Sequence, residues 1–244
     1  YIAMSRSNFG MLRDLLLLLP FILARVPVIA HVHGAEFDAY FLKSPRLVRI
    51  KAWYLARVAR FIFVNEVFVP TEPHLAIRSH FVCNPIPQFA VDALARPPVN
   101  HRRDRPCFGF ISTFAKEKGI DLFLDAATCF ADRADFVVAG GPSIENPTYG
   151  SKILAQIDRM DEVRYLGYVS DPTPFYEQCD FMIFPTNFAS ETSSLVVIEA
   201  LATRTRPIVR RHNRLMDIFN AAPIDWFDER DGLIGFDVSS FYGT

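Results

Sequence analysis

Short apolar segments alternate with helical stretches along the first part of the chain. Residues 7–24 have the apolar spacing of a helix, with Ser7 or Asn8 available as its cap. Residues 26–32, VPVIAHV, form a continuous apolar segment of strand length. A helical stretch is expected from about residue 45 to residue 61. The remaining expected elements of this part are a strand at 67–70, a helix at 72–79 and a strand at 80–87.

The composition changes between residues 92 and 105, where DALARPPVNHRRDR holds two prolines, many charges and little periodicity. We interpret this segment as a linker. The alternation resumes after it, so the pattern predicts two doubly wound units with parallel sheets in tandem. A ligand cleft is expected between them, at the carboxyl ends of their strands. The expected strands of the second part are 107–111, 135–139, 163–166, 181–184 and 207–209, and its expected helices are 119–131, 152–160, a short one around 175, and 195–203.

Composition limits the classes of protein to consider. Half of the 244 residues are apolar, which is enough for a substantial buried core. Twenty-six Lys and Arg against 27 Asp and Glu leave a formal net charge of -1, which gives no overall field to attract nucleic acid. The cysteines form no Cys-x-x-Cys pair of the zinc or redox type, so we expect reduced core cysteines in a cytoplasmic protein. They are Cys83, Cys107, Cys129 and Cys179.

The longest apolar run covers residues 15–24. It is too short for the roughly 20 residues of a membrane-spanning helix, and Pro20 interrupts it. No small-residue cleavage site follows, so the run does not resemble a signal peptide. We interpret it as the buried helix of an α/β layer. Docking onto a membrane surface is the alternative.

A cluster of arginines lies in TRTRPIVRRHNR, near the end of the chain. A charge cluster of this kind is usually a solvated face of the protein. The alternative is an arginine contact with a phosphate or an anionic acceptor. The cluster consists of Arg204, Arg206, Arg210, Arg211 and Arg214.

Two carboxylates, Glu191 and Glu199, bracket seven residues directly after the expected strand DFMIFPT. Between them, Thr192, Ser193 and Ser194 would form the first turn of a helix. The free amides and the positive dipole end of such a turn can hold a diphosphate, and the two serine hydroxyls can add donors. The carboxylates could accept hydrogen bonds from sugar and ribose hydroxyls. Glu199 alone would be read as a helix residue turned toward solvent.

This pattern resembles the retaining GT-B glycosyltransferases of family four. That family is marked by two Glu separated by seven residues, running into EALA and then a PVV-like strand, and here EALATRTRPIV fits this description. Further stretches resemble the family's phosphate-binding loop, its next strand and glycine turn, the strand beside the nucleotide base, and landmarks of its first domain, in the family's order. These stretches are STFAKEKGIDLFLDAA, FVVAGGP, VRYLGYVSD, CDFMIFPT, HVHGAEF and CNPIP.

The resemblance implies an α/β GT-B fold, in which two Rossmann-like, doubly wound parallel-sheet domains face a cleft. Residues 1–97 would be an incomplete acceptor-side domain, and residues 98–244 a nucleotide-sugar-binding domain without its last helices. The implied activity moves a sugar from a nucleotide-sugar donor to a saccharide or lipid-linked acceptor, with retention of configuration and without a metal or cofactor. The implied role is synthesis of cell-surface polysaccharide or glycolipid, in the cytoplasm or at the cytoplasmic face of the membrane.

The same resemblance assigns roles to single residues. Lys118 would contact the donor phosphates, Glu191 the transferred sugar and Glu199 the ribose, while His33 would sit against the donor sugar from the other side of the cleft. Lys118, Glu191 and His33 are thus the catalytic candidates. Lys118 suits its role because an ammonium can stabilise the charge that develops on a departing nucleoside diphosphate. Taken alone, it would be read as an ordinary surface lysine.

Two departures from the family keep alternatives open. Thr113, one of the implied donor-binding residues, stands where the family has an arginine in its phosphate loop, so one phosphate counter-charge is missing. The glycine pair after the PVV-like strand is replaced by RRHNRLMD. A degenerate protein that binds nucleotide sugar without transfer, or a GT-B sugar-nucleotide epimerase, are the alternatives. His31 and His33 face the same side of a strand, but no Cys, Asp or Glu triplet nearby supports a metal site.

Overall fold

The computed structural model describes residues 1–34, 37–96, 104–188, 191, 194–211, 213–219, 221–228 and 233. The chain divides into two compact units, each with a parallel β-sheet of its own. The first comprises Tyr1–Pro85 and Ala189–Ser193, and the second comprises Ile86–Phe188 and Ser194–Thr244. The main division therefore falls earlier than the expected boundary at 97/98.

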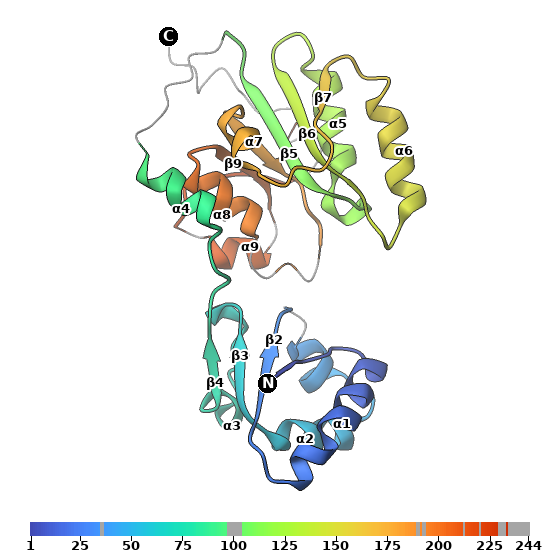
Figure 1. The fold of residues 1–244 in the computed structure, drawn as a ribbon, viewed down its shortest axis with the longest axis vertical. Coiled ribbons are helices and arrows are strands. Elements are labelled where there is room, and N and C mark those ends of the chain that lie inside the picture. Colours follow the sequence, from blue (N-terminus) through green and yellow to red (C-terminus); the bar gives the residue numbers. More distant parts are fainter. Residues whose placement is uncertain are drawn as a thin grey trace. The chain divides into compact units, whose positions relative to one another are not determined.

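The first unit holds a four-stranded sheet with the order β1-β2-β3-β4 (Figure 1). Each strand pairs in parallel with the next, so the chain adds its strands in one direction. Its strands are β1 (Ile2–Ala3), β2 (Val28–Val32), β3 (Val58–Phe63) and β4 (Ser79–Phe81). Its helices are α1 (Asn8–Leu23), the π-helix η1 (Asp38–Lys43), α2 (Val48–Arg57), the 3₁₀ helix η2 (Glu66–Phe68) and α3 (Pro73–Ala76).

Helices α1 and α2 pack on the same face of this sheet. Crossovers between parallel strands are right-handed, and because all the strands are added in one direction, the crossover helices fall on one side. The core that they share includes Met11 and Leu18 of α1, Tyr54 of α2, and the strand residues Ala30 and Phe61. The expected cap of α1 is confirmed, since the Ser7 hydroxyl accepts a hydrogen bond from the Gly10 amide at 3.1 Å.

Two expectations for the first unit were wrong. The helix expected over 45–61 ends at Arg57, because Val58 and Phe61 are needed in the sheet, where they are almost fully buried. In place of the strand expected at 67–70, the chain forms the 3₁₀ helix η2, whose start is capped by the Asn65 side chain accepting from the Val67 amide at 3.1 Å. Short apolar runs do not separate these possibilities by themselves.

The second unit holds a six-stranded sheet with the order β10-β9-β8-β5-β6-β7. All of its strand pairs are parallel. Its strands are β5 (Cys107–Phe114), β6 (Asp135–Pro142), β7 (Val163–Tyr165), β8 (Phe181–Phe184), β9 (Arg206–Arg210) and β10 (Asp225–Phe227). Its helices are α4 (Gln88–Ala95), the 3₁₀ helix η3 (Lys116–Lys118), α5 (Ile120–Cys129), α6 (Pro147–Ile157), α7 (Thr173–Glu177), α8 (Leu195–Ala202) and α9 (Asn213–Ile218).

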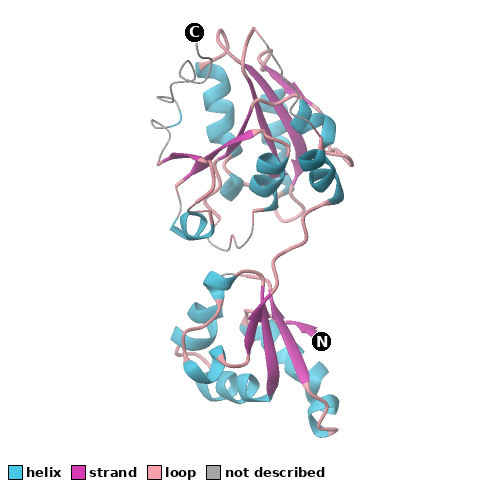
Figure 2. Cartoon of the chain, turned by 90° about the vertical axis from the view of Figure 1, so that its left-hand side faces the viewer, coloured by secondary structure: helices cyan, strands magenta, loops and turns pink. Residues whose placement is uncertain are grey.

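Helices cover both faces of the second sheet, and Figures 1 and 2 show this layering. Side chains alternate along β6: Phe136 and Val138 pack with α5 and α6, whereas Val137 and Ala139 pack with the helices of the opposite face. This is why the strands read as apolar on both sides in the sequence. The predicted doubly wound arrangement is confirmed for this unit.

The order of the second sheet reverses beside β5. From β5 the chain moves outward through β6 and β7, and it then returns to build β8, β9 and β10 on the other side of β5. The loops after β5 and β8 therefore leave the sheet at its topological switch point, where open α/β sheets bind their ligands.

Helix α4 belongs to the second unit and explains the early boundary. It packs on α8, and the ring of Phe89 stacks on that of Tyr176 with centroids 6.1 Å apart. The Arg204 guanidinium donates a hydrogen bond to the carbonyl of Arg96, just past the end of α4, at 2.8 Å. The expected linker at 92–105 thus begins inside a docked helix, and residues 97–103 lie outside the described residues.

None of the four cysteines is in a disulfide, and only two of them lie in the core. Cys107 and Cys179 are buried, whereas Cys83 and Cys129 are exposed, which corrects the expectation of four core cysteines. Within the described part of the chain, none of the helices combines the length and the apolar character needed to cross a membrane.

Candidate active site

The turn after β5 is the first component of the candidate site. Strand β5 runs into η3, and Gly119 ends that turn with a backbone φ of 75° before α5 begins. A Cβ atom at Gly119 would lie 2.3 Å from the carbonyl oxygen of Pro185, so the turn approaches the chain after β8 too closely for any side chain. Lys118, the last residue of η3, is half-buried at this switch point.

The loop after β8 is tied to this turn by hydrogen bonds. The Glu117 carbonyl accepts from the Thr186 hydroxyl at 3.1 Å and from the Asn187 amide at 2.8 Å. The ammonium of Lys118 lies over the ring of Phe188, 4.7 Å from its centroid. A cation held over an aromatic face is attracted by the ring quadrupole. The fold therefore fixes Lys118 beside the loop that leads to α8.

Helix α8 begins at the far end of this loop, with Ser194 as its N-cap residue. Ser194 is only 2% exposed, and among the described residues its hydroxyl has no hydrogen-bond partner. Its carbonyl accepts from the amides of Val197 and Ile198, each at 3.1 Å. The earlier amides of a helix have no partner within the helix and carry its positive dipole end, so this turn suits an anion.

Glu199, in the middle of α8, is half-buried and held by a neighbour. The Tyr176 hydroxyl donates to Oε2 of Glu199 at 2.8 Å. Burial raises the pKa of the Glu199 carboxyl above its usual value, and the hydrogen bond from Tyr176 lowers it in part. Burial, and then the charge of Glu199, raise the pKa of Tyr176, so that hydroxyl stays a donor. The interpretation of Glu199 as a residue turned wholly to solvent is therefore wrong.

The end of β5 also meets the glycine turn of β6. Gly140 has a φ of 120°, and a Cβ atom there would lie 1.9 Å from the Ser112 carbonyl oxygen. Thr113 is exposed at this end of β5, opposite Gly141 in the strand register. The threonine that replaces an arginine is thus at the same edge of the sheet as Lys118, but it brings no charge.

Comparison with known proteins places a similarity to one family in this part of the chain. Residues 105–221 match the protein family described as glycosyl transferases group 1. This segment resembles a group 1 glycosyltransferase domain. The match spans the Lys118 turn, the loop after β8 and α8, which together make up the candidate site.

Two curated proteins resemble this chain over part of its length. Granule-bound starch synthase 1 of Pisum sativum is 29% identical over 135 residues, which are 49% of this chain and 21% of that protein. The N,N'-diacetylbacillosaminyl-diphospho-undecaprenol alpha-1,3-N-acetylgalactosaminyltransferase of Campylobacter jejuni is 26% identical over 156 residues, which are 59% of this chain and 40% of that protein. The chain therefore spans less than half the length of either relative.

Among solved structures, the fold resembles that of Anabaena Alr3699/HepE in complex with UDP and glucose. The TM-score is 0.67 at 15% sequence identity, over 94% of this chain and 65% of that one. An identity this low concerns the fold alone. The α/β architecture with two parallel sheets is that of the GT-B glycosyltransferases, as the sequence predicted.

The remaining site residues stay predictions. Thr192 and Ser193 lie outside the described residues. Glu191 is half-buried and falls with the first unit in the division of the chain, as does His33. Their roles toward a donor are therefore expected from the motif and not from distances.

The two histidines of the first unit do face the same side, as predicted. The rings of His31 and His33 have centroids 3.9 Å apart. Burial, and then the neighbouring His33, lower the pKa of His31 below its usual value, which favours a neutral ring. In the described ranges, with their gaps, no three His, Cys, Asp or Glu side chains gather as metal ligands would.

Three members of the arginine cluster have structural partners. Arg204 holds the end of α4, Arg206 pairs with Asp225 of β10, and Arg211 pairs with Asp228 at 2.8 Å. Arg210 is half-buried at the carboxyl end of β9, the same edge of the parallel sheet as the Lys118 turn. The cluster is therefore not simply a solvated face, because three of its arginines form hydrogen bonds or ion pairs with neighbouring segments of the second unit.

Sequence reasoning missed Tyr176 and Phe188. Tyr176 lies in the short helix expected around residue 175, and Phe188 lies in the loop that follows β8. Each acts on a predicted residue through a tertiary contact, with Glu199 and Lys118 respectively. The one available signal was the position of these aromatic residues on either side of the apolar segment DFMIFPT, with Tyr176 four residues before it and Phe188 two residues after it.

Proposed function

We propose that this chain is part of an enzyme that transfers a sugar from a nucleoside diphosphate donor to a saccharide or lipid-linked acceptor. The observation that carries the proposal is the arrangement at the switch point of the second sheet. There a lysine fixed over Phe188 and the start of α8, with its buried Ser194 hydroxyl, belong to two connected loops. This combination of a cation and helix amides suits a diphosphate.

Sugar transfer from a nucleoside diphosphate requires a site that stabilises negative charge on the leaving group. When the bond between sugar and diphosphate breaks, negative charge develops on the leaving phosphate, and the sugar gains oxocarbenium-like character. The Lys118 ammonium and the first amides of α8 would stabilise the leaving phosphate. Glu199, oriented by Tyr176, would accept a hydrogen bond from the ribose. Glu191 would orient the transferred sugar, and His33 would lie against it.

The similar proteins support this proposal through what their names state. The Campylobacter jejuni relative is a transferase whose name includes a diphospho-undecaprenol acceptor, and the Anabaena structure contains UDP and glucose. They support a nucleotide-sugar donor and an acceptor that is a saccharide or is linked to a lipid. Retention of configuration, independence of metal ions, and a role in cell-surface polysaccharide or glycolipid synthesis in the cytoplasm rest on the motif resemblance and are parts of the same proposal.

A donor panel tests the proposal. The chain is incubated with UDP-, GDP- and ADP-sugars, with and without acceptor extract, and release of nucleoside diphosphate is measured. We expect release with at least one donor. Lys118→Ala should lower kcat/KM by about 30-fold or more, which corresponds to roughly 2 kcal/mol or more for a lost oxyanion-type donor. Release by no donor under any condition, or a loss below tenfold, would count against the proposal.

A second candidate is a protein that binds a nucleotide sugar without transferring it, and Thr113 is the observation that favours it. Without the arginine of this position, the leaving phosphate has one counter-charge fewer. Arg210 is the candidate to replace the missing positive charge. It ends β9, which is separated from β5 by β8 alone, at the same edge of the sheet. If Arg210→Ala abolishes turnover but leaves donor affinity within twofold, Arg210 supplies the missing charge and transfer is favoured. Donor binding without turnover in the unaltered protein would favour the second candidate.

A further inference from the structure

Helix α1 carries a buried apolar stripe and a second, exposed one. Met11, Leu15, Leu18 and Ile22 pack on or against the core of the first unit. A second set at helical spacing faces solvent, and we call it the outer stripe; its members are Phe9, Leu12, Leu16, Leu19 and Leu23. A helix that is apolar on every side is normally buried or in contact with a membrane.

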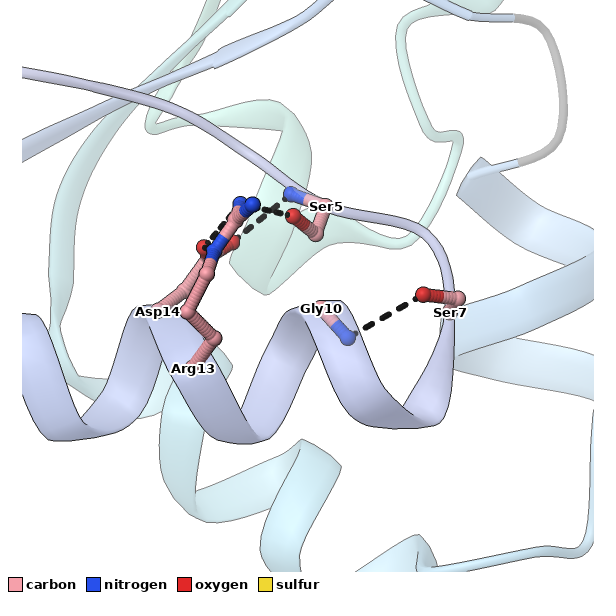
Figure 3. Close-up of polar contacts among 5 residues, drawn as sticks. All are labelled: Ser5, Ser7, Gly10, Arg13 and Asp14. Atoms are coloured by element: carbon pink, nitrogen blue, oxygen red, sulfur yellow. Dashed lines mark hydrogen bonds and ion pairs between the residues drawn. The ribbon is translucent and has the colours of Figure 1, made fainter.

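The outer stripe is truly exposed in this unit. Phe9 is 82% exposed, Leu16 73% and Leu23 75%. The N-terminal end of α1 is fixed by polar contacts, which Figure 3 shows. Asp14 is fully buried, accepts from the Ser5 amide at 2.8 Å and pairs with Arg13 at 2.7 Å. These contacts hold α1 in one orientation about its axis, so the outer stripe does not turn into the core.

Helix α2 extends this surface beside α1. Both helices pack on one face of the sheet, so their exposed sides point away from it together. The outer side of α2 presents Trp53, 41% exposed, with the Arg57 guanidinium 5.0 Å from its ring centroid. Arg49 is exposed on the same helix. Tryptophan and arginine beside apolar side chains are typical of surfaces that lie in the headgroup region of a bilayer.

Charge is distributed unevenly along the chain. Residues 1–60 contain nine Lys and Arg against three Asp and Glu, although the whole chain is nearly neutral. In residues 1–34 and 37–60, which the structure describes, no acidic side chain is exposed, since Asp14 is buried and Asp38 is partly covered. The exposed basic residues of α1, α2 and their flanking turns are Arg13, Arg25, Lys43, Arg46, Arg49 and Arg57.

We infer that the outer faces of α1 and α2 form a surface that docks on an anionic lipid bilayer. The outer stripe would enter the headgroup and upper acyl region, with Trp53 at the boundary and the arginines paired with lipid phosphates. Charge complementarity selects this partner over a second copy of the chain, because a symmetric contact would bring like charges together. The inference rests on the first unit alone and does not depend on the proposed transfer activity.

Vesicle sedimentation tests the inference. The full chain is mixed with vesicles of phosphatidylcholine alone, or of phosphatidylcholine and phosphatidylglycerol at a ratio of 3:1, at low and high salt. We expect binding to the anionic vesicles at low salt and weaker binding at high salt. The double variant Leu16→Gln/Leu23→Gln should lower the partition coefficient by about tenfold or more, because two exposed apolar side chains are lost without loss of core. Arg49→Glu/Arg57→Glu should remove the preference for anionic vesicles.

The matched control is Ile144→Gln, which changes an apolar residue that is 97% exposed in the second unit. It should leave the partition coefficient unchanged. A Trp53-dependent blue shift on vesicle binding, absent in Trp53→Phe, would support insertion of this surface. No sedimentation with anionic vesicles, or equal sedimentation of the Leu16/Leu23 variant, would overturn the inference. A dimer in light scattering that the Leu16/Leu23 variant converts to monomer, without vesicle binding, would assign the stripe to a second copy instead.

Discussion

Tyr176 is the residue through which the second unit positions Glu199. Its ring is 1% exposed, so its hydroxyl can reach few partners other than the carboxylate of α8. A hydrogen bond to a charged acceptor at a half-buried position contributes more than one in open water. The orientation of Glu199 therefore depends on a residue of a separate helix, α7.

Replacing Tyr176 by Phe removes that bond and keeps the ring. We expect the free energy of unfolding in urea to fall by about 1 to 2 kcal/mol, because the Glu199 oxygen loses its donor where water replaces it only in part. The control is Tyr168→Phe, whose ring is 87% exposed and whose hydroxyl already faces water. An unchanged stability in Tyr176→Phe would show that the bond does not hold Glu199.

The raised pKa of Glu199 gives a pH dependence with a definite sign. Because the folded state holds the proton more tightly than the unfolded chain, this group favours folding below its usual pKa of 4.5, and that contribution is lost as the pH rises through the raised value. Glu199→Gln cannot lose a proton. The unfolding free energy of Glu199→Gln minus that of the original protein should therefore increase as the pH rises from 4 to 7. A difference that stays constant over this range would contradict the burial of Glu199.

At the level of single residues, sequence motifs pointed to candidate site residues but not to the side chains that support them. Lys118 and Glu199 were predicted from ordered landmarks, and the fold places Lys118 at the switch point. Tyr176 and Phe188 could not be predicted, since their roles come from packing between elements that are distant in the sequence. Thr192 and Ser193 lie outside the described residues, so their predicted contacts are still predictions.

At the level of elements, the junction of η3 with α5 determines where Lys118 lies. Gly119 has a φ of 75° and almost touches the Pro185 carbonyl, so it joins the two loops of the candidate site. Gly119→Ala should lower the unfolding free energy by about 2 kcal/mol or more, because both the backbone region and the space are unfavourable to a side chain. The substitution should also weaken nucleotide binding by displacing Lys118.

Gly141→Ala is the matched control for this prediction. A Cβ atom at Gly141 would meet no atom within 4 Å, so its stability should change by less than about 0.5 kcal/mol. Urea denaturation of both variants measures the difference. Equal stability of the two would mean that the approach of Gly119 to Pro185 does not constrain the turn.

Longer helices and strands were predictable from the sequence, whereas several short ones were not. Five of the six strands of the second sheet and α5 were predicted nearly in place, because their apolar positions repeat over enough residues, whereas the edge strand β10 was missed. The secondary structure predicted for residues 58–63 and 67–70 was wrong, because a few apolar residues fit a helix end, a strand or a 3₁₀ turn equally well. Tertiary pairing decides among these, as β3 shows by pairing with both β2 and β4.

At the scale of the whole molecule, two parallel sheets were predictable from the alternation of helices and strands. The division between the units was not, because α4 looks like the start of a polar linker and yet packs on α8. Its attachment depends on Phe89 and on the Arg204 guanidinium, and neither contact is visible in local sequence.

Phe89→Ala tests this assignment of α4. We expect it to speed hydrogen exchange in α4 and α8 and to lower the stability of the second unit by about 2 kcal/mol, through loss of a packed ring. Exchange in the first unit should not change. Val91→Ala, on the same helix at a side chain that is 43% exposed, should have little effect. Faster exchange in the first unit instead would move the boundary back toward residue 97.

Calorimetric titration with nucleoside diphosphates tests the central claim most directly. UDP, GDP and ADP are titrated into the unaltered protein, into Lys118→Ala, and into Lys152→Ala, which removes an exposed lysine from α6. We predict that at least one nucleotide binds, that Lys118→Ala weakens its binding by about tenfold or more, and that Lys152→Ala binds as the unaltered protein does. Binding of none of the three, or equal binding by Lys118→Ala, would contradict a diphosphate site at the switch point of the second sheet.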